Sequence, residues 1–134
     1  IYRYDEVASG EVRHPLRFAS NSAKKGGSVW PARSSDGTND AADAMPMGAR
    51  LRLKSDADLS KLGPQARIIA KALSTFGAVS ADSSGSGWGF GGEGDSRWDD
   101  ADLATLSTLD LNQFEVVDTD AWRVSDDSME ARIK

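Results

Sequence analysis

Two adjacent carboxylates lie close in sequence to the one histidine of the chain. Asp5 and Glu6 are neighbours, and His14 follows in the same N-terminal stretch. Paired carboxylates can supply the acid and the base or nucleophile that cleave a glycosidic bond, and imidazole exchanges protons near neutral pH. We therefore take Asp5, Glu6 and His14 as candidate catalytic residues, of the kind that a glycoside hydrolase or polysaccharide lyase uses. Surface turns and a structural histidine would explain the same three residues.

The counts of histidine and cysteine exclude several other kinds of site. A single histidine excludes a two-histidine metal site within this chain, and the absence of cysteine excludes thiolate nucleophiles, cysteine metal ligands and disulfide bonds. A serine triad would have to use His14, and the sequence has no G-x-S-x-G segment to present the serine. The sequence therefore excludes metal sites that need two histidines or any cysteine.

A stretch of oxygen-bearing side chains has the spacing of a calcium-binding loop. Asp82, Ser84, Ser86 and Glu93 occupy ligand positions of that pattern, and Gly87 occupies the position of its sharp turn. Two of these ligands are serines, which compete poorly with water, and strands rather than helices are expected on either side. We expect a flexible Gly/Ser-rich hairpin and no resident cofactor, with a calcium site as the alternative.

Four tryptophans give the chain large aromatic side chains. An exposed indole can stack on a sugar ring, whereas a buried indole fills a small core. We expect Trp30 and Trp98 to pack into the core, Trp30 as the anchor of a long loop. Trp88 lies in a glycine-rich segment that cannot bury it alone, so it is a candidate platform for a sugar.

Length and charge limit the class of protein further. The chain has 134 residues, with 16 Lys and Arg against 21 Asp and Glu, and its formal net charge is −5. This length suits one compact domain, and the acidic balance argues against partners such as nucleic acid or an anionic membrane surface. No apolar stretch approaches the roughly 20 residues of a membrane-spanning helix. The chain begins at Ile1 rather than Met, so we expect a processed product or a fragment.

The elements that must position these residues begin with extended chain. Apolar residues recur at alternate positions up to Phe18, which predicts two strands joined by a turn, the second interrupted by Pro15. A long surface loop is expected at 19–47. The alternation of Arg50–Lys54 is typical of a strand with one apolar face.

Helix signals occur twice in the second half of the chain. Pro64 begins a helix with one apolar stripe, and Gly77 ends it. Asp99 is placed to cap a second, short helix whose buried side would consist of Leu103 and Leu106.

Short strands are expected between and after these helices. The segments 78–82 and 88–90 are predicted to form a hairpin, and 114–117 a last strand. We therefore expect an α+β fold that is β-rich, with a sandwich or jelly-roll-like sheet and two short helices. It would span 1–122 and be followed by a polar tail at 123–134.

Five short segments follow one another in a characteristic order along the chain. They are RYDEV at 3–7, VWPAR at 29–33, PMGARLRLK at 46–54, RWDD at 97–100 and FEVVD at 114–118. In this order they resemble a largely uncharacterised family of extracellular proteins found mostly in bacteria. The resemblance covers roughly Tyr2 to Thr119.

The resemblance has two implications for this chain. It implies that the chain corresponds to the C-terminal part of a larger, split domain, whose N-terminal part would be a companion polypeptide from the same precursor. It also marks recurrent residues of the family as site candidates, namely Asp5, Glu6, His14, Trp30, Arg33 and Arg97.

Together these observations predict a secreted, extracellular domain that recognises or processes carbohydrate. Asp5, Glu6 and His14 would be its acid and base groups. Its substrate-binding residues would be Trp30, Arg33, Trp88 and Arg97. The alternative is a structural or interaction subunit that docks on the companion chain and has no catalytic activity.

Overall fold

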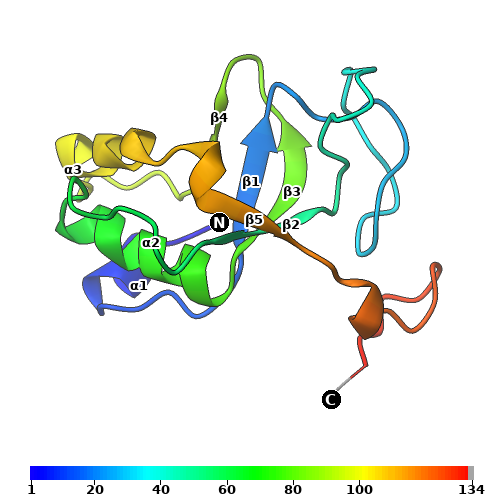
Figure 1. Ribbon diagram of the computed structural model, residues 1–134. Coiled ribbons are helices and arrows are strands. Elements are labelled where there is room, and N and C mark those ends of the chain that lie inside the picture. Colours follow the sequence, from blue (N-terminus) through cyan, green and yellow to red (C-terminus); the bar gives the residue numbers. More distant parts are fainter. Residues whose placement is uncertain (133–134) are drawn as a thin grey trace. The chain divides into compact units, whose positions relative to one another are not determined.

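The computed structural model describes residues 1–132 and combines a sheet with short helices and long loops (Figure 1). The elements in chain order are α1 (Tyr4–Ala8), β1 (Leu16–Ser20), β2 (Arg50–Leu53), α2 (Pro64–Thr75), β3 (Ala78–Ser83), β4 (Trp88–Phe90), α3 (Asp100–Ala104) and β5 (Phe114–Val117). Short 3₁₀ turns lie at Thr105–Thr108, Leu111–Gln113 and Asp120–Trp122. The predicted α+β class is confirmed.

The strands form one five-stranded sheet in the order β4-β1-β3-β2-β5. Strands β4 and β5 are therefore the two edges, and β3 lies between β1 and β2. Strands β2 and β5 lie close to their predicted positions at 50–54 and 114–117. The 1–132 portion of the chain contains no second sheet, so the finer expectation of a sandwich or jelly roll is not confirmed.

The segment Tyr4–Ala8 is a helix, where the sequence predicted a strand. The Glu6 side chain accepts the backbone N–H of Arg3 at 2.9 Å, which satisfies a donor at the start of the helix. Tyr2 and Tyr4, whose alternation suggested the strand, both place their rings edge-on to Trp98, at centroid distances of 5.6 and 5.1 Å. The prediction was wrong because these two rings share an indole rather than one face of a sheet.

Strands β3 and β4 were predicted as a hairpin, and this prediction is also wrong. Strand β1 lies between them in the sheet. The end of β1 forms hydrogen bonds to both ends of the loop that connects β3 and β4. Ser84 N–H donates to Ser20 O at 3.2 Å, and Asn21 N–H donates to Gly87 O at 2.8 Å. The Gly/Ser-rich loop therefore connects two strands that share a neighbour.

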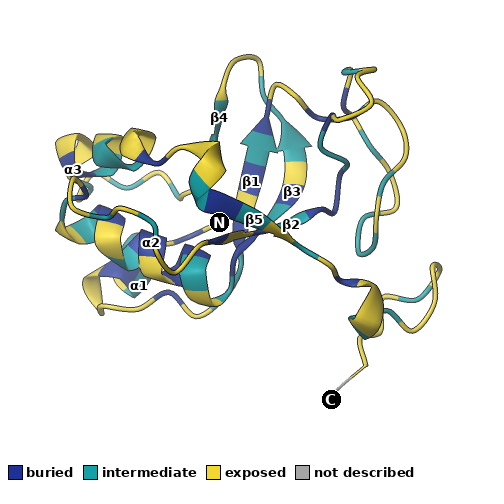
Figure 2. Cartoon of the chain, viewed as in Figure 1, coloured by how far each residue is buried: buried dark blue, intermediate teal, exposed yellow. Residues whose placement is uncertain are grey.

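Helix α2 lies where the sequence placed it. Pro64 is its first residue, and Gly77 follows its end with a φ of +75°, in the left-handed region that favours glycine. Figure 2 shows that one side of α2 is buried, and this side consists of Ala66, Ile69, Ala70, Ala72 and Leu73. The apolar stripe predicted from the sequence is therefore the side of α2 that is buried.

Helix α3 has the predicted cap and a different buried residue. Asp99 accepts the Asp102 N–H at 3.1 Å, as expected. Leu103 and Leu106 are only half-buried, whereas Asp102 is 9% exposed. The carboxylate of Asp102 accepts backbone N–H groups at the start of α2, so the expectation of a purely apolar buried side was wrong.

The residues group into two compact units. Unit 1 comprises Ile1–Leu16, Leu51–Ala78 and Phe90–Glu115, and contains the three α-helices. Unit 2 comprises Arg17–Arg50, Val79–Gly89 and Val116–Lys134, of which residues up to 132 are described.

The whole of the predicted surface loop at 19–47 belongs to unit 2. Two isolated bridges, Ala23 with Met45 and Lys24 with Asn39, hold it together. The predicted polar tail at 123–134 starts with a bridge between Arg123 and Ala131, and its residues 133 and 134 lie outside the described part.

Candidate functional site

Glu6 and His14, both in unit 1, form a close pair. His14 Nε2 lies 3.1 Å from Glu6 Oε1, and His14 Nδ1 lies 2.8 Å from the backbone oxygen of Pro15. Glu6 also accepts the Arg3 N–H that starts α1. Both side chains therefore hold the local backbone, and they are also within the distance at which a proton can pass between them.

Asp5 lies on the same helix and pairs with Arg97. Arg97 Nη1 is 2.9 Å from Asp5 Oδ1, Arg97 Nη2 is 2.6 Å from Asp95 Oδ2, and the guanidinium lies 4.1 Å from the centroid of the Tyr4 ring. The hydrogen bonds from Arg97 lower the pKa of the Asp95 carboxyl to about 2. Chiefly through its hydrogen bond with Asp95, the pKa of Arg97 is raised above its usual value.

The structure therefore brings four predicted site residues, Asp5, Glu6, His14 and Arg97, to one short helix. The same helix is fixed by Glu93, whose Oε1 accepts the Tyr4 N–H at 2.6 Å and whose backbone oxygen accepts the Trp98 indole N–H at 2.9 Å. Trp98 is half-buried against the two tyrosines rather than fully enclosed as predicted. These contacts attach α1 to the segment at 93–98.

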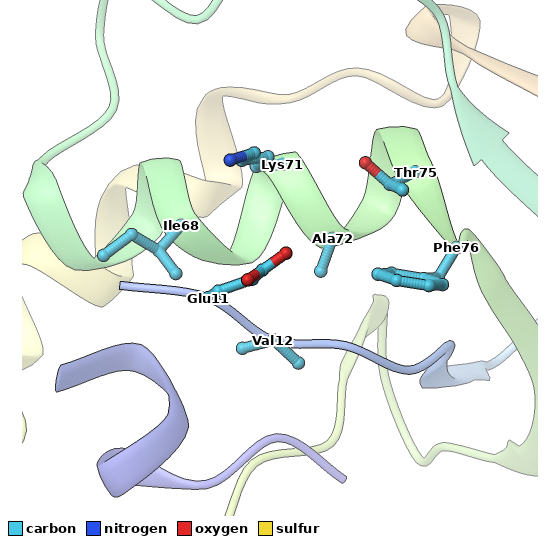
Figure 3. Close-up of a pocket in the computed structure, with 7 residues that line it drawn as sticks. All are labelled: Glu11, Val12, Ile68, Lys71, Ala72, Thr75 and Phe76. Atoms are coloured by element: carbon cyan, nitrogen blue, oxygen red, sulfur yellow. The ribbon is translucent and has the colours of Figure 1, made fainter. Parts of the chain in front are cut away.

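A small hollow lies beside α2 in the same unit (Figure 3). Glu11 and Val12 face the helix there, opposite Lys71, Ala72 and Phe76. Its volume is about 10 Å³, which suits one water molecule at most. The hollow is far too small for a sugar ring.

The larger concave site lies in unit 2 and contains two other predicted residues. It consists of two adjoining pockets, of about 590 and 490 Å³, and Val29 and Asp120 line both of them. The polar pocket, of about 590 Å³, is lined chiefly by Trp30, Arg33, Asp120, Arg123, Asp126 and Asp127. We refer to it as the Trp30 pocket.

Backbone contacts position Trp30 in this pocket. Its indole N–H donates to Ser128 O at 2.9 Å, and its own backbone oxygen accepts the Thr119 hydroxyl at 3.2 Å. The side chain is half-buried, so Trp30 joins the loop to residues near 119–128 and still lines an open cavity. It was predicted as a core anchor and as a binding residue; its side chain is only half-buried, and the binding role stays a prediction.

The charges of the Trp30 pocket are only partly neutralised. Arg123 pairs with Asp126 and lies 3.7 Å from Asp120. Arg33 is exposed and, within residues 1–132, has no ion-pair or hydrogen-bond partner for its guanidinium; Asp127 likewise lacks one for its carboxylate. A planar donor and an acceptor therefore remain available beside the indole.

The remaining predicted residues lie apart from this pocket. Trp88 in β4 is half-buried, with its ring 6.0 Å from that of Phe18, and it lines neither of the two pockets described above. Asp82 forms an ion pair with Arg17, and Ser84 bonds to backbone oxygens of its own loop at Ser86 and Gly87.

These contacts give the calcium alternative no support. Glu93, its last predicted ligand, belongs to unit 1 and binds the Tyr4 N–H. Over the described 1–132 range, no group of three or more His, Cys, Asp or Glu side chains is arranged to hold a metal ion. Within the same range, no helix has the length and apolar composition needed to span a membrane.

The acidic and basic residues at 120–127 that line the Trp30 pocket were not predicted as site residues. Asp120, Arg123 and Asp126 are spaced three apart, and this repeat of opposite charges was a usable signal. The polar composition of that region predicted instead the end of the domain and a polar tail. Nothing local in the sequence indicated that it would meet Trp30, about 90 residues earlier.

Comparison of the chain with protein-family models, with curated proteins and with solved structures gave no match.

Proposed function

We propose that the chain is an extracellular carbohydrate-recognising domain and that the Trp30 pocket of unit 2 is its binding site. The observation that carries the proposal is the combination of a half-exposed indole with an unpaired guanidinium and an unpaired carboxylate in one cavity. The cavity volume of about 590 Å³ falls in the range of about 300 to 1,000 Å³ typical of small-ligand sites.

The chemistry of this pocket matches that of a sugar ring. The C–H face of a sugar can stack on the Trp30 indole, which is an apolar aromatic surface. Its hydroxyl groups can accept hydrogen bonds from Arg33 and donate them to Asp127. The three acidic and two basic side chains of the pocket favour a neutral or weakly charged sugar over a strongly anionic one.

A glycan array tests this proposal with the full chain. We expect saturable retention of at least one glycan, and a loss of about tenfold in affinity for Arg33→Gln, because a charge-assisted hydrogen bond contributes about 1.5 kcal/mol or more. Arg13→Gln is the matched control, since Arg13 is exposed and its partner Glu11 lies in unit 1.

Two results would overturn the proposal. One is the absence of retention on any glycan of a broad array by the folded wild-type chain. The other is retention that Arg33→Gln and Trp30→Ala leave at the wild-type level.

We propose separately that the chain also cleaves the carbohydrate, with Glu6 and His14 as the acid and base. Their separation of 3.1 Å is suitable for an acid and base, and Asp5 lies on the same helix. If a glycan-degrading activity is measured, Glu6→Gln and His14→Ala should each abolish most of it. Activity that survives both substitutions would exclude the catalytic assignment without affecting recognition.

The alternative function, a subunit docked on a companion chain, is favoured by a different surface. Strand β5 is an edge of the sheet and presents Val116, which is 71% exposed. In this proposal the chain is the C-terminal part of a larger domain, and strands of the companion would supply the second sheet of a sandwich. Co-purification of a second polypeptide with the native chain, detected by intact mass spectrometry, would support it, and recovery of this chain alone would argue against it.

A further inference from the structure

Strand β5 pairs with β2 on one side and ends the strand order on the other. Lys54 N–H donates to Gln113 O at 2.8 Å, and Arg52 Nε lies 2.8 Å from Glu115 Oε1. These contacts pair position 54 with 113 and position 52 with 115, which is an antiparallel register. The two strands therefore follow the alternating hydrogen-bond pattern of antiparallel pairs.

This register determines where the peptide groups of β5 point. Peptide groups of successive residues alternate between the partner strand and the open side. Since Gln113 faces β2, Glu115 and Val117 face it too, and the N–H and C=O of Val116 point to the open side. No other segment within residues 1–132 pairs with β5 there. The edge at Val116 thus offers one donor and one acceptor to an added strand.

The apolar side chains of β5 are buried at the start of the strand and exposed further along it. Phe114 and Val116 share one face of the strand because side chains alternate. Phe114 is 8% exposed and Val116 is 71% exposed. An apolar side chain is therefore left uncovered beside an open peptide edge, a combination that proteins usually avoid unless a partner covers it.

An apolar pocket of about 490 Å³ adjoins this edge within unit 2. Its apolar lining comes from β5 and from the loop before β2, and includes Val116, Val117, Val29, Ala44, Met45 and Pro46. Val29 is itself 42% exposed. The pocket can accommodate one or two aliphatic side chains of an added strand.

The charges around this apolar pocket are mainly acidic. Asp43, Asp118 and Asp120 line it, against one basic residue, Arg50. Asp43 has no ion-pair or hydrogen-bond partner for its side chain within the described chain, and Asp118 accepts only the Asp120 N–H. Burial lowers the pKa of Arg50, in keeping with a guanidinium partly withdrawn from water. A basic residue next to the apolar side chains of a partner would neutralise this rim.

We propose that the edge of β5 at Val116, together with this pocket, binds an extended segment of another polypeptide by strand addition. The partner segment carries apolar residues, which enter the pocket, and lysine or arginine residues beside them, which meet Asp43 and Asp118 at the rim. Main-chain hydrogen bonds to Val116 supply affinity and the pocket supplies specificity, as in other cases of strand addition. This inference gives the docking alternative a surface and a partner chemistry, and it does not depend on the carbohydrate proposal.

Three fluorescein-labelled peptides test the inference with the full chain by fluorescence anisotropy. The first is the basic peptide KVTVKVTVK, the second is its acidic counterpart EVTVEVTVE, and the third is the basic peptide with every amide N-methylated. We expect the basic peptide to bind at least about tenfold more tightly than either of the others. The acidic peptide tests the charge of the rim, and the methylated peptide tests the main-chain hydrogen bonds.

Variants of the chain test the same surface. Val116→Pro removes the outward N–H without removing a bond to β2, and it should weaken binding of the basic peptide about tenfold while the far-ultraviolet circular dichroism stays unchanged. Asp43→Asn should weaken it several-fold, whereas Asp56→Asn, an exposed site in unit 1, should not. If Val116→Pro does not fold, the methylated peptide tests the same bonds on the wild-type chain.

The inference is wrong if the basic peptide does not bind, or if it binds no better than the acidic or methylated peptide. It is also wrong if Asp56→Asn weakens binding as much as Asp43→Asn, because charge in general would then explain the affinity. Neither result bears on the retention of glycans by the Trp30 pocket.

Discussion

The Asp102 carboxylate stabilises a helix to which it does not belong. Its two oxygens accept the N–H groups of Gln65 and Ala66 at 2.8 and 3.0 Å, and both groups lie in the first turn of α2. The N-cap of helix α2 is Gly63, which has no side chain to offer a capping oxygen, so Asp102 supplies the missing acceptor. A negative charge at this end also favours the helix dipole.

We expect Asp102→Ala to lower the free energy of unfolding by about 2 kcal/mol, because it leaves one buried and one partly buried N–H group unsatisfied. Urea denaturation followed by circular dichroism measures this loss. Asp56→Ala, which removes an exposed carboxyl in the same unit, should change stability by less than about 0.5 kcal/mol. Equal stabilities of the two variants would show that Asp102 does not cap α2.

The pair of Asp95 and Arg97 gives a prediction about pH. The pKa of Asp95 is lowered from 3.8 to about 2. The ionised carboxylate therefore contributes fully to the stability of the folded chain above pH 3.8, and this contribution is lost as the pH falls through about 2. Carboxyl NMR titration should show this midpoint, and Arg97→Gln should raise it toward the ordinary value. Asp58 is the control, because its pKa is lowered chiefly by Ser60 and should not respond to Arg97→Gln. An unchanged Asp95 midpoint in Arg97→Gln would contradict the assigned cause.

Local sequence signals predicted roles that depend on neighbours and failed for roles that depend on distant partners. The cap at Asp99 was predicted because its partner Asp102 is three residues away. The burial of Asp102 itself was not, because its partners lie 36 and 37 residues earlier. For the same reason Trp30 and Arg33 were identified as candidates, while the wall of the pocket at 120–127 was not.

At the scale of elements, the turn at Gly48 connects the long loop to β2. Gly48 has a φ of +87°, and its N–H donates to Ser80 O at 2.7 Å. A side chain at this position would meet the backbone oxygen of Val29 and the side chain of Ala32, which flank the Trp30 segment. The glycine therefore permits the close approach that places Trp30 beside its pocket.

We expect Gly48→Ala to lower the free energy of unfolding by about 2 kcal/mol, since it combines a disfavoured φ with a steric clash. Gly85→Ala is the matched control, because Gly85 has open space around it and no left-handed φ, and it should stay within about 0.5 kcal/mol of the wild type. Thermal or urea unfolding of both variants measures the difference. A Gly48→Ala chain as stable as Gly85→Ala would mean that the turn tolerates a side chain.

Elements with a complete local pattern were predicted well. Helix α2 has a marked beginning, a marked end and one apolar stripe, and strand β2 alternates along its length. The strand predicted at the N-terminus failed because Tyr2 and Tyr4 alternate for a different reason, their shared contact with Trp98. The β3 and β4 hairpin failed because a short connection does not exclude a third strand between its arms.

At the scale of the whole molecule, each unit carries a different kind of chemistry. Unit 1 contains the Glu6 and His14 pair and the Arg97 ion pairs. Unit 2 contains the Trp30 pocket and the acidic, apolar edge at Val116. The acidic balance of the chain, a net charge of −5, argues against polyanionic partners and suits a partner segment rich in lysine or arginine.

The division into two units could not be predicted from composition. Each unit takes three separate stretches of the chain, so no linker or change of composition marks a boundary. The α+β class followed from local signals, whereas the strand order depends on pairings across long sequence separations. The sequence therefore identified Trp30 and Arg33 of the Trp30 pocket without showing which residues meet them, and it did not indicate the edge at Val116.

The most direct test of the central proposal observes Trp30 itself while a glycan binds. The indole N–H resonances of the four tryptophans can be followed in a ¹⁵N-labelled chain during titration with a glycan retained on the array, and Trp30→Phe assigns one of them. We expect the Trp30 resonance to shift saturably and those of Trp88 and Trp98 to stay in place, with the titration weakened about tenfold in Arg33→Gln. A glycan that shifts Trp88 or Trp98 and leaves Trp30 unmoved would contradict the assignment of the binding site to the Trp30 pocket.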